Sequence, residues 1–344
     1  MSDPAVSTPV LEVRDLEVEF ATYGGVVKAV RGVSYAVERG RTLAVVGESG
    51  CGKSVTVQAI MGLIDMPPGR ITGGSARLLG QELIGLGARA INRVRGAAIG
   101  MIFQDPMTSL NPTMKIGSQI AETLIAHRGM ARREALAQAV QLLDRTRIPE
   151  AGKRANQYPF ELSGGMLQRV MIAISLACKP ALLIADEPST ALDVTIQNQV
   201  LELMREIQRE EGMAIVLITH DLGVVARMAD DVAVMYAGRI VESGPVEDIF
   251  YRSAHPYTTG LKRAMPGAAR THRKLVAIAG SPPDLFAVPP GCAYAPRCPH
   301  AMNICAVHDP APSALGAQHR ASCWLHHPQA PAVATTPPTM SDTR

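Results

Sequence analysis

Long apolar runs and aromatic side chains are scarce in this sequence of 344 residues. Aromatic residues make up 4% of it, with a single tryptophan. The longest apolar runs, such as the stretch from Val170 to Cys178, reach about half of the ~20 residues that a membrane-spanning helix needs. We therefore expect no transmembrane segment in this chain.

A strong charge of either sign is absent as well. Lys and Arg number 34 against 31 Asp and Glu, a net charge of +3, which is too small a bias to indicate binding to the nucleic-acid backbone. The first ten residues lack the basic segment and apolar core of an export signal, so we expect the chain to stay in the reducing cytosol. In that compartment its six cysteines favour metal binding or thiol reactivity over disulfides.

The hydrophobic pattern predicts an α/β core. Alternation of apolar and polar residues predicts half-buried strands at 11–20 and 28–37. Nearly continuous apolar runs predict strands covered on both faces. The further expected strands are 41–46, 97–103, 181–186, 213–219, 231–236 and 238–244, and the expected helices include 53–63 and 194–210.

A helical insertion is expected between these strands. It covers about 116–177 and is interrupted by Pro149 and Pro159. We expect the core to end near Phe250 and the Pro/Ala/Thr-rich end from about His327 to be disordered. A chain of this length suits one large α/β domain with an appendage, or two domains.

The stretch "GESGCGKS", Gly47 to Ser54, fits the phosphate-loop pattern and stands where that pattern requires, between a buried strand and a helix. Gly47, Gly50 and Gly52 allow the backbone to bend so that its amides face a phosphate. Lys53 is placed to reach the β- and γ-phosphates, and the Ser54 hydroxyl is placed to bind Mg²⁺. The motif predicts nucleotide binding.

Two carboxylates follow another buried strand, in "ALLIADEP". Asp186 and Glu187 stand at its carboxyl end, where open α/β sheets place ligand groups. Asp186 is expected in the Mg²⁺ shell, and Glu187 is expected to orient or deprotonate the attacking water. The alternative is that the pair only caps the next turn.

These motifs resemble those of ABC transporter ATPase subunits. "LSGGMLQR", Leu162 to Arg169, is similar to the ABC signature, with Met166 where Gln is more usual. The resemblance implies that Ser163, Gly164 and Gly165 bind the nucleotide held by a facing subunit. The fold it implies is a P-loop (RecA-like) α/β core with an antiparallel β subdomain, a helical insertion and a small C-terminal Cys-rich extension.

The same resemblance assigns roles to further residues. Gln104 matches the Q-loop residue, a catalytic and Mg²⁺-binding position, and His220 in "ITHD" matches the switch histidine at the γ-phosphate. "STALD", Ser189 to Asp193, matches the D-loop. Tyr23 is a candidate to stack on adenine, with a surface-loop tyrosine as the alternative. The nucleotide-binding set also takes in other members of the phosphate loop and its helix, namely Ser49, Cys51 and Val55.

Longer stretches narrow the resemblance to the subgroup that powers dipeptide and oligopeptide importers. They are "MIFQDPMTSLNP", "LIADEPSTALDVTIQ" and "HPYTTGL". This implies ATP hydrolysis coupled to peptide uptake at the cytoplasmic face of the inner membrane. The implied partners are a second, similar ATPase, two permease subunits and a periplasmic or extracellular binding protein. A soluble ABC ATPase of DNA repair or translation, or an importer of nickel or glutathione, remain alternatives.

The resemblance also implies a division of the chain. A nucleotide-binding domain is expected at 9–253, with its helical part at about 105–178. A C-terminal domain is expected at 254–326, followed by a tail at 327–344.

Four of the six cysteines stand close together near the end of the chain. Their spacing resembles the C-terminal motif of the importer subgroup, and four cysteinates suit a [4Fe–4S] cluster or a tetrahedral Zn²⁺. Because short C-x2-C pairs are missing, the cluster is favoured over zinc, and four unligated thiols are the remaining alternative. We expect a small structural module outside the ATPase core that leaves ATP affinity unaffected, with a redox sensor that gates activity as the alternative. The four ligands would be Cys292, Cys298, Cys305 and Cys323.

The other two cysteines are expected to play lesser parts. Cys51, in the phosphate loop, is interpreted as a small residue that fits, with oxidation sensitivity as the alternative. Cys178 is interpreted as a core residue.

Overall fold

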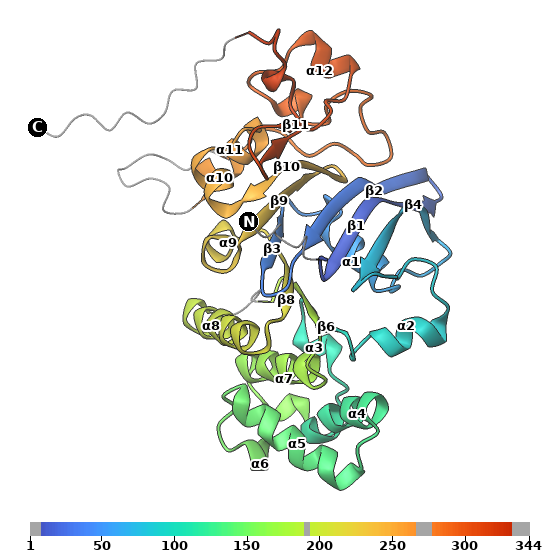
Figure 1. Cartoon of the computed structure of the whole chain (residues 1–344), viewed down its shortest axis with the longest axis vertical. Helices are drawn as coiled ribbons and strands as arrows, with labels where there is room; N and C mark the ends of the chain where they lie inside the picture. The colour runs from blue at the N-terminus through green and yellow to red at the C-terminus, as the bar shows by residue number, and fades with distance from the viewer. Residues whose placement is uncertain (1–7, 189–192, 266–276, 332–344) are drawn as a thin grey trace, which may run out of the picture.

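The computed structural model describes residues 8–188, 193–265 and 277–331. Figure 1 shows an elongated arrangement in which a group of helices forms one end and the C-terminal region forms the other. Two β-sheets lie between these ends. No helix among the described residues is both long and apolar enough to cross a membrane.

The larger sheet carries the expected buried strands. Its parallel part has the order β9-β3-β8-β7-β6, and β10 joins β9 antiparallel at one edge. Valine, isoleucine and leucine dominate these strands because helices and the second sheet cover them on both faces. The bounds are β3 (Thr42–Val46), β6 (Ile99–Ile102), β7 (Leu182–Asp186), β8 (Ala214–Thr219), β9 (Asp231–Tyr236) and β10 (Arg239–Pro245).

The smaller sheet is antiparallel, as expected, and has the order β2-β1-β4-β5. Its inward residues share one hydrophobic core with β3, β7, β8 and the helix after the phosphate loop. The sequence pattern predicts β1 and β2 but not β4, because β4 contains three glycines and shows no clean alternation. The bounds are β1 (Leu11–Thr22), β2 (Gly25–Val37), β4 (Gly69–Leu78) and β5 (Gln81–Glu82).

The predicted helical insertion is confirmed as a bundle with its own hydrophobic core. Gly129, in the left-handed conformation, ends α4, and α5 begins three residues later. A short 3₁₀ turn at Pro159–Glu161 then leads into α7, which packs against α3, α4, α5 and β6. The bounds are α3 (Pro106–Ser109), α4 (Ile116–Arg128), α5 (Arg132–Arg145), α6 (Ala151–Arg154) and α7 (Gly164–Leu176).

Further helices connect and cover the strands of the larger sheet. Asp193 caps α8 by accepting a hydrogen bond from the Ile196 amide at 2.9 Å, and Asp221 caps α9 in the same way through the Gly223 amide at 2.7 Å. The bounds are α1 (Lys53–Ile60), α2 (Ala88–Val94), α8 (Val194–Glu211), α9 (Leu222–Met228) and α10 (Val246–Tyr251).

The expectation that the core ends near Phe250 is wrong. Tyr257 and Tyr294 are buried in one hydrophobic cluster with Ala44 and Val46 of β3. The C-terminal strand β12 also pairs with β10, so the larger sheet continues into the C-terminal region. Its elements are α11 (Pro256–Arg263), α12 (Asn303–Val307), β11 (Ser313–Ala314), β12 (Arg320–Ala321) and 3₁₀ turns at Ala295–Arg297 and Trp324–His326.

A buried carboxylate fixes this junction. Glu242 of β10 accepts hydrogen bonds from the amides of Ala254 (2.7 Å) and His255 (2.9 Å), and its Oε1 lies 2.8 Å from Nε2 of His319. The side chains of Glu242 and His319 are 0% and 6% exposed. Glu242 therefore links β10 both to the start of the C-terminal region, at Ala254 and His255, and to its later part, at His319.

Candidate functional site

The phosphate loop forms a tight turn between β3 and α1. A Cβ atom at Gly47 would lie 2.2 Å from the Met235 carbonyl oxygen, and one at Gly52 would lie 2.3 Å from the Ala29 carbonyl oxygen. Gly52 also has φ +103, a conformation that other residues rarely adopt. These contacts explain why the loop requires glycine at both positions.

Lys53 lies inside this turn and is almost fully buried. Its Nζ donates hydrogen bonds to the carbonyl oxygens of Gly47 at 2.8 Å and Glu48 at 3.0 Å. The loop backbone therefore holds the ammonium group within the turn that a polyphosphate would occupy. Ser49 and Gly50 are exposed at the tip of the loop, and Val55 is half-buried in the first turn of α1.

Ser54 and Asp186 meet across 132 residues of sequence. The Ser54 hydroxyl donates a hydrogen bond to Oδ1 of Asp186 at 3.0 Å. Burial raises the pKa of Asp186, while this hydrogen bond opposes the shift and the neighbouring Glu187 adds to it. A hydroxyl and a carboxylate oxygen at this separation fit the hard oxygen ligands that Mg²⁺ prefers.

Glu187 is held at the carboxyl edge of the parallel strands. Its Oε2 accepts a hydrogen bond from Nε2 of Gln104 at 3.0 Å, and its Oε1 lies 3.2 Å from Nδ1 of His220. These residues follow β7, β6 and β8, so the sheet brings three sequence-predicted catalytic residues together. Gln104 thus contacts Glu187, whereas its expected position beside Mg²⁺ stays a prediction.

The backbone of Glu187 also has an uncommon conformation. Its φ is +47, in the left-handed region, and its amide donates a hydrogen bond to the Ile218 carbonyl at 2.9 Å. The chain therefore turns sharply just after β7 and presents the carboxylate at the sheet edge. Such conformations cluster at functional sites.

The signature residues lie on a different part of the chain. Ser163 precedes α7, and Ser163 and Gly164 are exposed to solvent at its N-terminus. A Cβ atom at Gly165 would lie 2.9 Å from Cγ2 of Ile196 on α8, so this glycine also serves close packing. Of the D-loop match, Ser189–Leu192 lie outside the described residues.

Tyr23 is fully exposed in the turn between β1 and β2. Phe286, from the C-terminal region, packs beside the adjoining Gly24, where a Cβ atom would lie 3.5 Å from its ring. Leu285 accepts a backbone hydrogen bond from Lys28 at 3.2 Å. Stacking of Tyr23 on adenine stays a prediction.

Cys51 is buried, and burial raises the pKa of its thiol, with Lys53 opposing the shift. A thiol with a raised pKa is less reactive, which favours its interpretation as a small packing residue. Cys178 is buried at the end of α7, as expected.

The sequence analysis does not predict two residues that contact the phosphate loop, Tyr257 and Arg297. Tyr257 Oη accepts a hydrogen bond from the Glu48 amide at 2.9 Å, and Arg297 binds the Glu48 carboxylate with both terminal nitrogens. Both residues stand inside stretches that mark the importer subgroup. Their role could not be read from sequence because more than 200 residues separate them from the loop.

The four C-terminal cysteines gather in one region of the molecule. Burial raises the pKa of the Cys292 thiol to about 11, and Cys305 and Cys298 add to the shift. Burial likewise raises the pKa of Cys323 to about 12, with contributions from the other three thiols. Among the described residues, however, no group of three or more His, Cys, Asp or Glu side chains is arranged to hold a metal ion.

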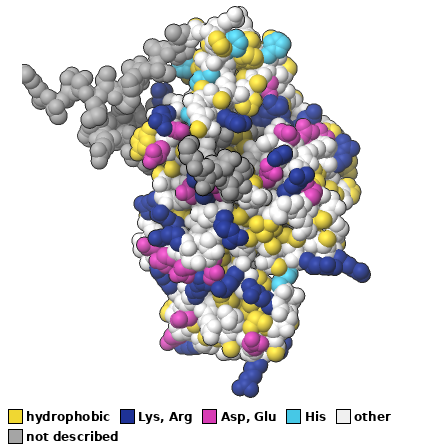
Figure 2. All heavy atoms as spheres, in the orientation of Figure 1, with side chains coloured by type: hydrophobic (Ala, Val, Ile, Leu, Met, Phe, Trp, Pro, Cys, Tyr) yellow, Lys and Arg dark blue, Asp and Glu magenta, His cyan; other side chains and the backbone are white. Residues whose placement is uncertain are grey.

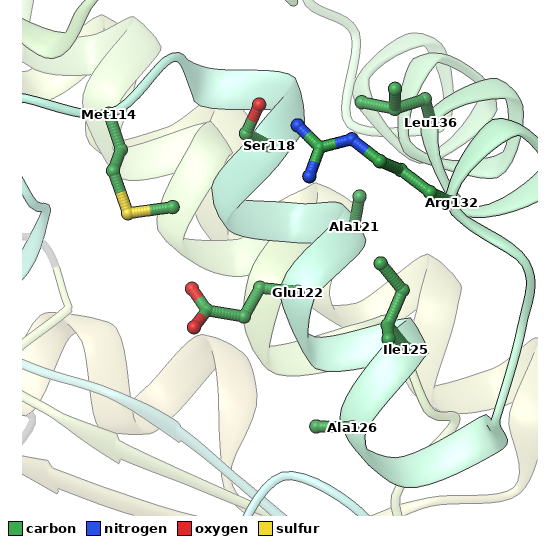
Figure 3. A pocket seen from close by; sticks show the side chains of 8 residues that line it. All are labelled: Met114, Ser118, Ala121, Glu122, Ile125, Ala126, Arg132 and Leu136. Carbon is green, nitrogen blue, oxygen red and sulfur yellow. The ribbon is translucent and has the colours of Figure 1, made fainter.

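A separate pocket of about 290 Å³ lies on the helical part of the molecule. Figure 3 shows that side chains of α4, such as Ser118, Ala121 and Ile125, form most of its wall. Met114, before α4, and Arg132 and Leu136 of α5 also line it. Glu122 of α4 also lines the pocket. None of the nucleotide-site residues above belongs to this lining.

This chain is an ATP-binding-cassette ATPase. Its site combines a phosphate loop around the buried Lys53, the hydrogen-bonded pair Ser54 and Asp186, and Glu187 bound by Gln104. The family described as "ABC transporter" matches residues 30–190. The ATP-binding cassette MJ0796, solved as a dimer bound to ADP and Pi, superposes with a TM-score of 0.62 at 26% identity, covering 69% of this chain and 98% of that one. CbiO1 from Clostridium perfringens gives a TM-score of 0.60 at 27% identity, covering 70% and 90%.

Closer relatives identify the family within that class. The region described as "Oligopeptide/dipeptide transporter, C-terminal region" matches residues 241–305. The oligopeptide transport ATP-binding protein OppD of Bacillus subtilis is 54% identical, covering 95% of this chain and 91% of the relative. The dipeptide transport ATP-binding protein DppD of the same organism is 50% identical, covering 93% and 96%. This chain therefore belongs to the family of oligopeptide and dipeptide transport ATP-binding proteins.

Proposed function

We propose that this chain binds MgATP, hydrolyses it and drives the uptake of dipeptides or oligopeptides through a membrane importer. One observation carries the proposal: the same chain has the nucleotide site of Ser54, Asp186 and Glu187 and a C-terminal region of the peptide-transporter type. The names of the 50–54% identical relatives support peptide as the cargo. Nickel or a glutathione-like thiol is the alternative cargo.

Each nucleotide-site residue has a proposed role. The amides of the phosphate loop and Lys53 bind the β- and γ-phosphates, and Tyr23 stacks on adenine. Ser54 and Asp186, with Gln104, hold Mg²⁺, which neutralises phosphate charge when bound. Glu187 accepts a proton from the attacking water, and Gln104 and His220 keep its carboxylate oriented.

The hydrolytic site requires a second subunit. The exposed Ser163 and Gly164, at the N-terminus of α7, offer a hydroxyl and free amides for a γ-phosphate held by the facing subunit. We propose a similar but non-identical ATPase as this partner. A dimer has been solved for MJ0796, which supports this arrangement for the fold.

Two permease subunits and an external binding protein complete the proposed importer. Next to Gln104, the apolar side chains of Phe103 and Met107 are 41% and 58% exposed, and the pocket of Figure 3 lies further along the same helical part. We propose that a permease segment docks over this face and that the chain works at the cytoplasmic side of the inner membrane. A change in the position of Gln104 would then act directly on the bound permease segment.

We propose the sequence-derived division for the chain: a nucleotide-binding domain at 9–253 with its helical part at about 105–178, a C-terminal domain at 254–326, and a tail at 327–344. The separate hydrophobic core of the helical part supports its treatment as a unit. The match of 241–305 to a peptide-transporter region supports a distinct C-terminal part.

Copurification of the complete complex tests the assignment. Coexpression of this chain with two permease subunits, a binding protein and a second ATPase of the same importer type should yield one assembly whose ATPase activity rises with bound peptide. Mass spectrometry of the ligand on the binding protein would distinguish peptides from nickel complexes or glutathione. Stable association with DNA or ribosomes in place of permeases would overturn the proposal.

A [4Fe–4S] cluster on the four C-terminal cysteines is proposed as a structural group. A single Zn²⁺ requires four sulfurs within about 4 Å of one another, whereas a four-iron cluster holds its thiolates further apart. The support for the proposal is the sequence spacing of the four cysteines and the mutual influence of their thiols on one another's pKa, which places them in one region. When bound, the cluster would supply the cross-link for a region of short, irregular elements.

Metal analysis after anaerobic purification tests this group. We expect four irons per chain and an iron–sulfur absorption band, both lost in Cys298→Ser. One zinc per chain would support the alternative, and neither metal would remove the proposal.

A further inference from the structure

Glu48, the second residue of the phosphate loop, is held from three sides. Its carboxylate accepts hydrogen bonds from Arg297, with Nη1 at 2.6 Å from Oε2 and Nη2 at 3.0 Å from Oε1. Its amide donates to the Tyr257 hydroxyl at 2.9 Å, and its carbonyl accepts from Lys53 at 3.0 Å. Two of these three contacts come from the C-terminal region.

Arg297 is itself fixed in place, unlike most surface arginines. Its side chain is 4% exposed, and its Nε donates to the Ala279 carbonyl at 2.9 Å. The guanidinium also lies over the Tyr236 ring, 5.8 Å from its centroid, and donates to the Tyr236 hydroxyl at 3.3 Å. A bidentate pair made by a pre-oriented, buried guanidinium is stronger and more directional than an exposed ion pair.

Tyr257 is equally rigid. It is fully buried, and its ring packs against those of Tyr236 (4.6 Å between centroids) and Tyr294 (5.4 Å). The hydroxyl therefore cannot move away from the Glu48 amide without disturbing this aromatic cluster. The loop is thus anchored to a packed part of the C-terminal region.

These contacts bear on the affinity for a polyphosphate. An unpaired carboxylate in the loop would repel the ligand, and the low dielectric of a partly buried site would strengthen that repulsion. Pairing with Arg297 neutralises the carboxylate. It also fixes the backbone at Glu48, whose carbonyl in turn binds the ammonium group of Lys53.

We propose that Arg297 and Tyr257 are positioning residues for the phosphate loop and that the C-terminal region sets ATP affinity through Glu48. The inference rests on the proposed assignment of residues 47–54 to the phosphates. It replaces the expectation that the C-terminal module leaves ATP affinity unaffected.

Equilibrium binding of ATP with Mg²⁺ to the full-length chain tests the proposal. Loss of a charge-assisted pair predicts that Arg297→Met weakens the ATP Kd about tenfold, with Arg297→Lys in between. Adding Glu48→Gln to Arg297→Met should restore most of the affinity, because no unpaired carboxylate remains. In the assembled complex, Arg297→Met should raise KM for ATP and leave kcat at saturating ATP nearly unchanged.

Arg239→Met provides the matched control. Arg239 also ties the C-terminal region to the core, through an ion pair with Asp309 and a 3.1 Å hydrogen bond to the Arg31 carbonyl. Within the described part of the chain, the Arg239 side chain makes its hydrogen bonds to Arg31 and Asp309 and to no residue of the phosphate loop. This variant should lower thermal stability and keep the wild-type ATP Kd.

Tyr257→Phe tests the same proposal if Arg297→Met does not fold. It keeps the buried ring and removes only the hydroxyl that accepts from Glu48, which predicts an ATP Kd about threefold weaker. Values within about twofold of wild type for Tyr257→Phe and for every folded Arg297 variant would overturn the proposal. If the double variant binds ATP as weakly as Arg297→Met alone, the loss of affinity is not caused by the unpaired Glu48 carboxylate.

Lys53→Ala separates this inference from the underlying assignment. If Lys53→Ala also binds ATP normally, residues 47–54 are not the phosphate site and the proposed function fails with the inference. If Lys53→Ala loses ATP while the Arg297 and Tyr257 variants do not, only the inference fails.

Discussion

Gln104 and Glu187, separated by 83 residues, meet at the carboxyl edge of the central sheet, where Nε2 of the amide lies 3.0 Å from Oε2 of the carboxylate. His220 approaches the other carboxylate oxygen at 3.2 Å. Both oxygens of Glu187 are therefore oriented by side chains that follow neighbouring strands. A carboxylate held in this way can accept a proton from a water in a fixed direction.

Glu187→Gln should abolish most hydrolysis and spare ATP binding. The amide keeps the size and one acceptor oxygen of the side chain but cannot take a proton. We expect kcat in the assembled complex to fall by about 10²-fold or more, with the ATP Kd nearly unchanged. Steady-state ATPase assays and equilibrium binding measure the two effects, and retained turnover would show that the role is misassigned.

Lys53→Ala should act on binding itself. The phosphates would lose a buried cation, so we expect the ATP Kd to rise by about tenfold or more. Lys179→Ala is the control, because Lys179 pairs with Glu211 in an exposed position. Calorimetric titration of both variants checks the difference, and near-normal affinity in Lys53→Ala would count against the phosphate-loop assignment.

The isolated chain should be a poor ATPase. Its signature residues lie at the exposed N-terminus of α7, where they are available to a partner's nucleotide. We expect specific activity to rise steeply with protein concentration and to rise further when the second ATPase is added. Full activity that does not depend on concentration, from a strictly monomeric sample, would contradict this.

His319→Ala should destabilise the junction between the sheet and the C-terminal region. The substitution removes the side chain that pairs with the fully buried Glu242 carboxylate and leaves, among the described residues, the Ala254 and His255 amides as its hydrogen-bond donors, which costs about 2–4 kcal/mol. Arg252→Ala, which breaks an exposed pair with Asp248, should cost about 1 kcal/mol or less. Urea unfolding measures both, and equal small losses would show that the buried pair adds little.

Local patterns in the sequence predict much of this molecule. Continuous apolar runs identify β3, β7 and β8, and the glycines before Lys53 identify the phosphate loop, because these features depend on neighbouring residues alone. Asp186 is predicted to lie near Ser54 since both follow strands of one sheet, and the 3.0 Å hydrogen bond between them agrees with this.

Contacts between distant segments are harder to predict. No local sequence pattern predicts that Arg297 binds Glu48, or that β12 extends the sheet beyond β10. The low content of large apolar residues after Pro282 suggests a weakly packed module, yet Tyr294 there is buried against β3 and β9. Figure 2 shows histidines on the surface of this end of the molecule, in keeping with the sequence, in which seven of the nine histidines follow residue 250.

Peptide uptake by the reconstituted complex tests the central claim most directly. Vesicles that contain the two permeases, both ATPases and the binding protein should accumulate a labelled peptide only when ATP is supplied on the side of this chain. Replacing wild type with Glu187→Gln should stop that uptake while the complex stays assembled and still binds ATP. Uptake that continues without ATP or with Glu187→Gln in place, or ATP hydrolysis with no peptide entering, would contradict the account.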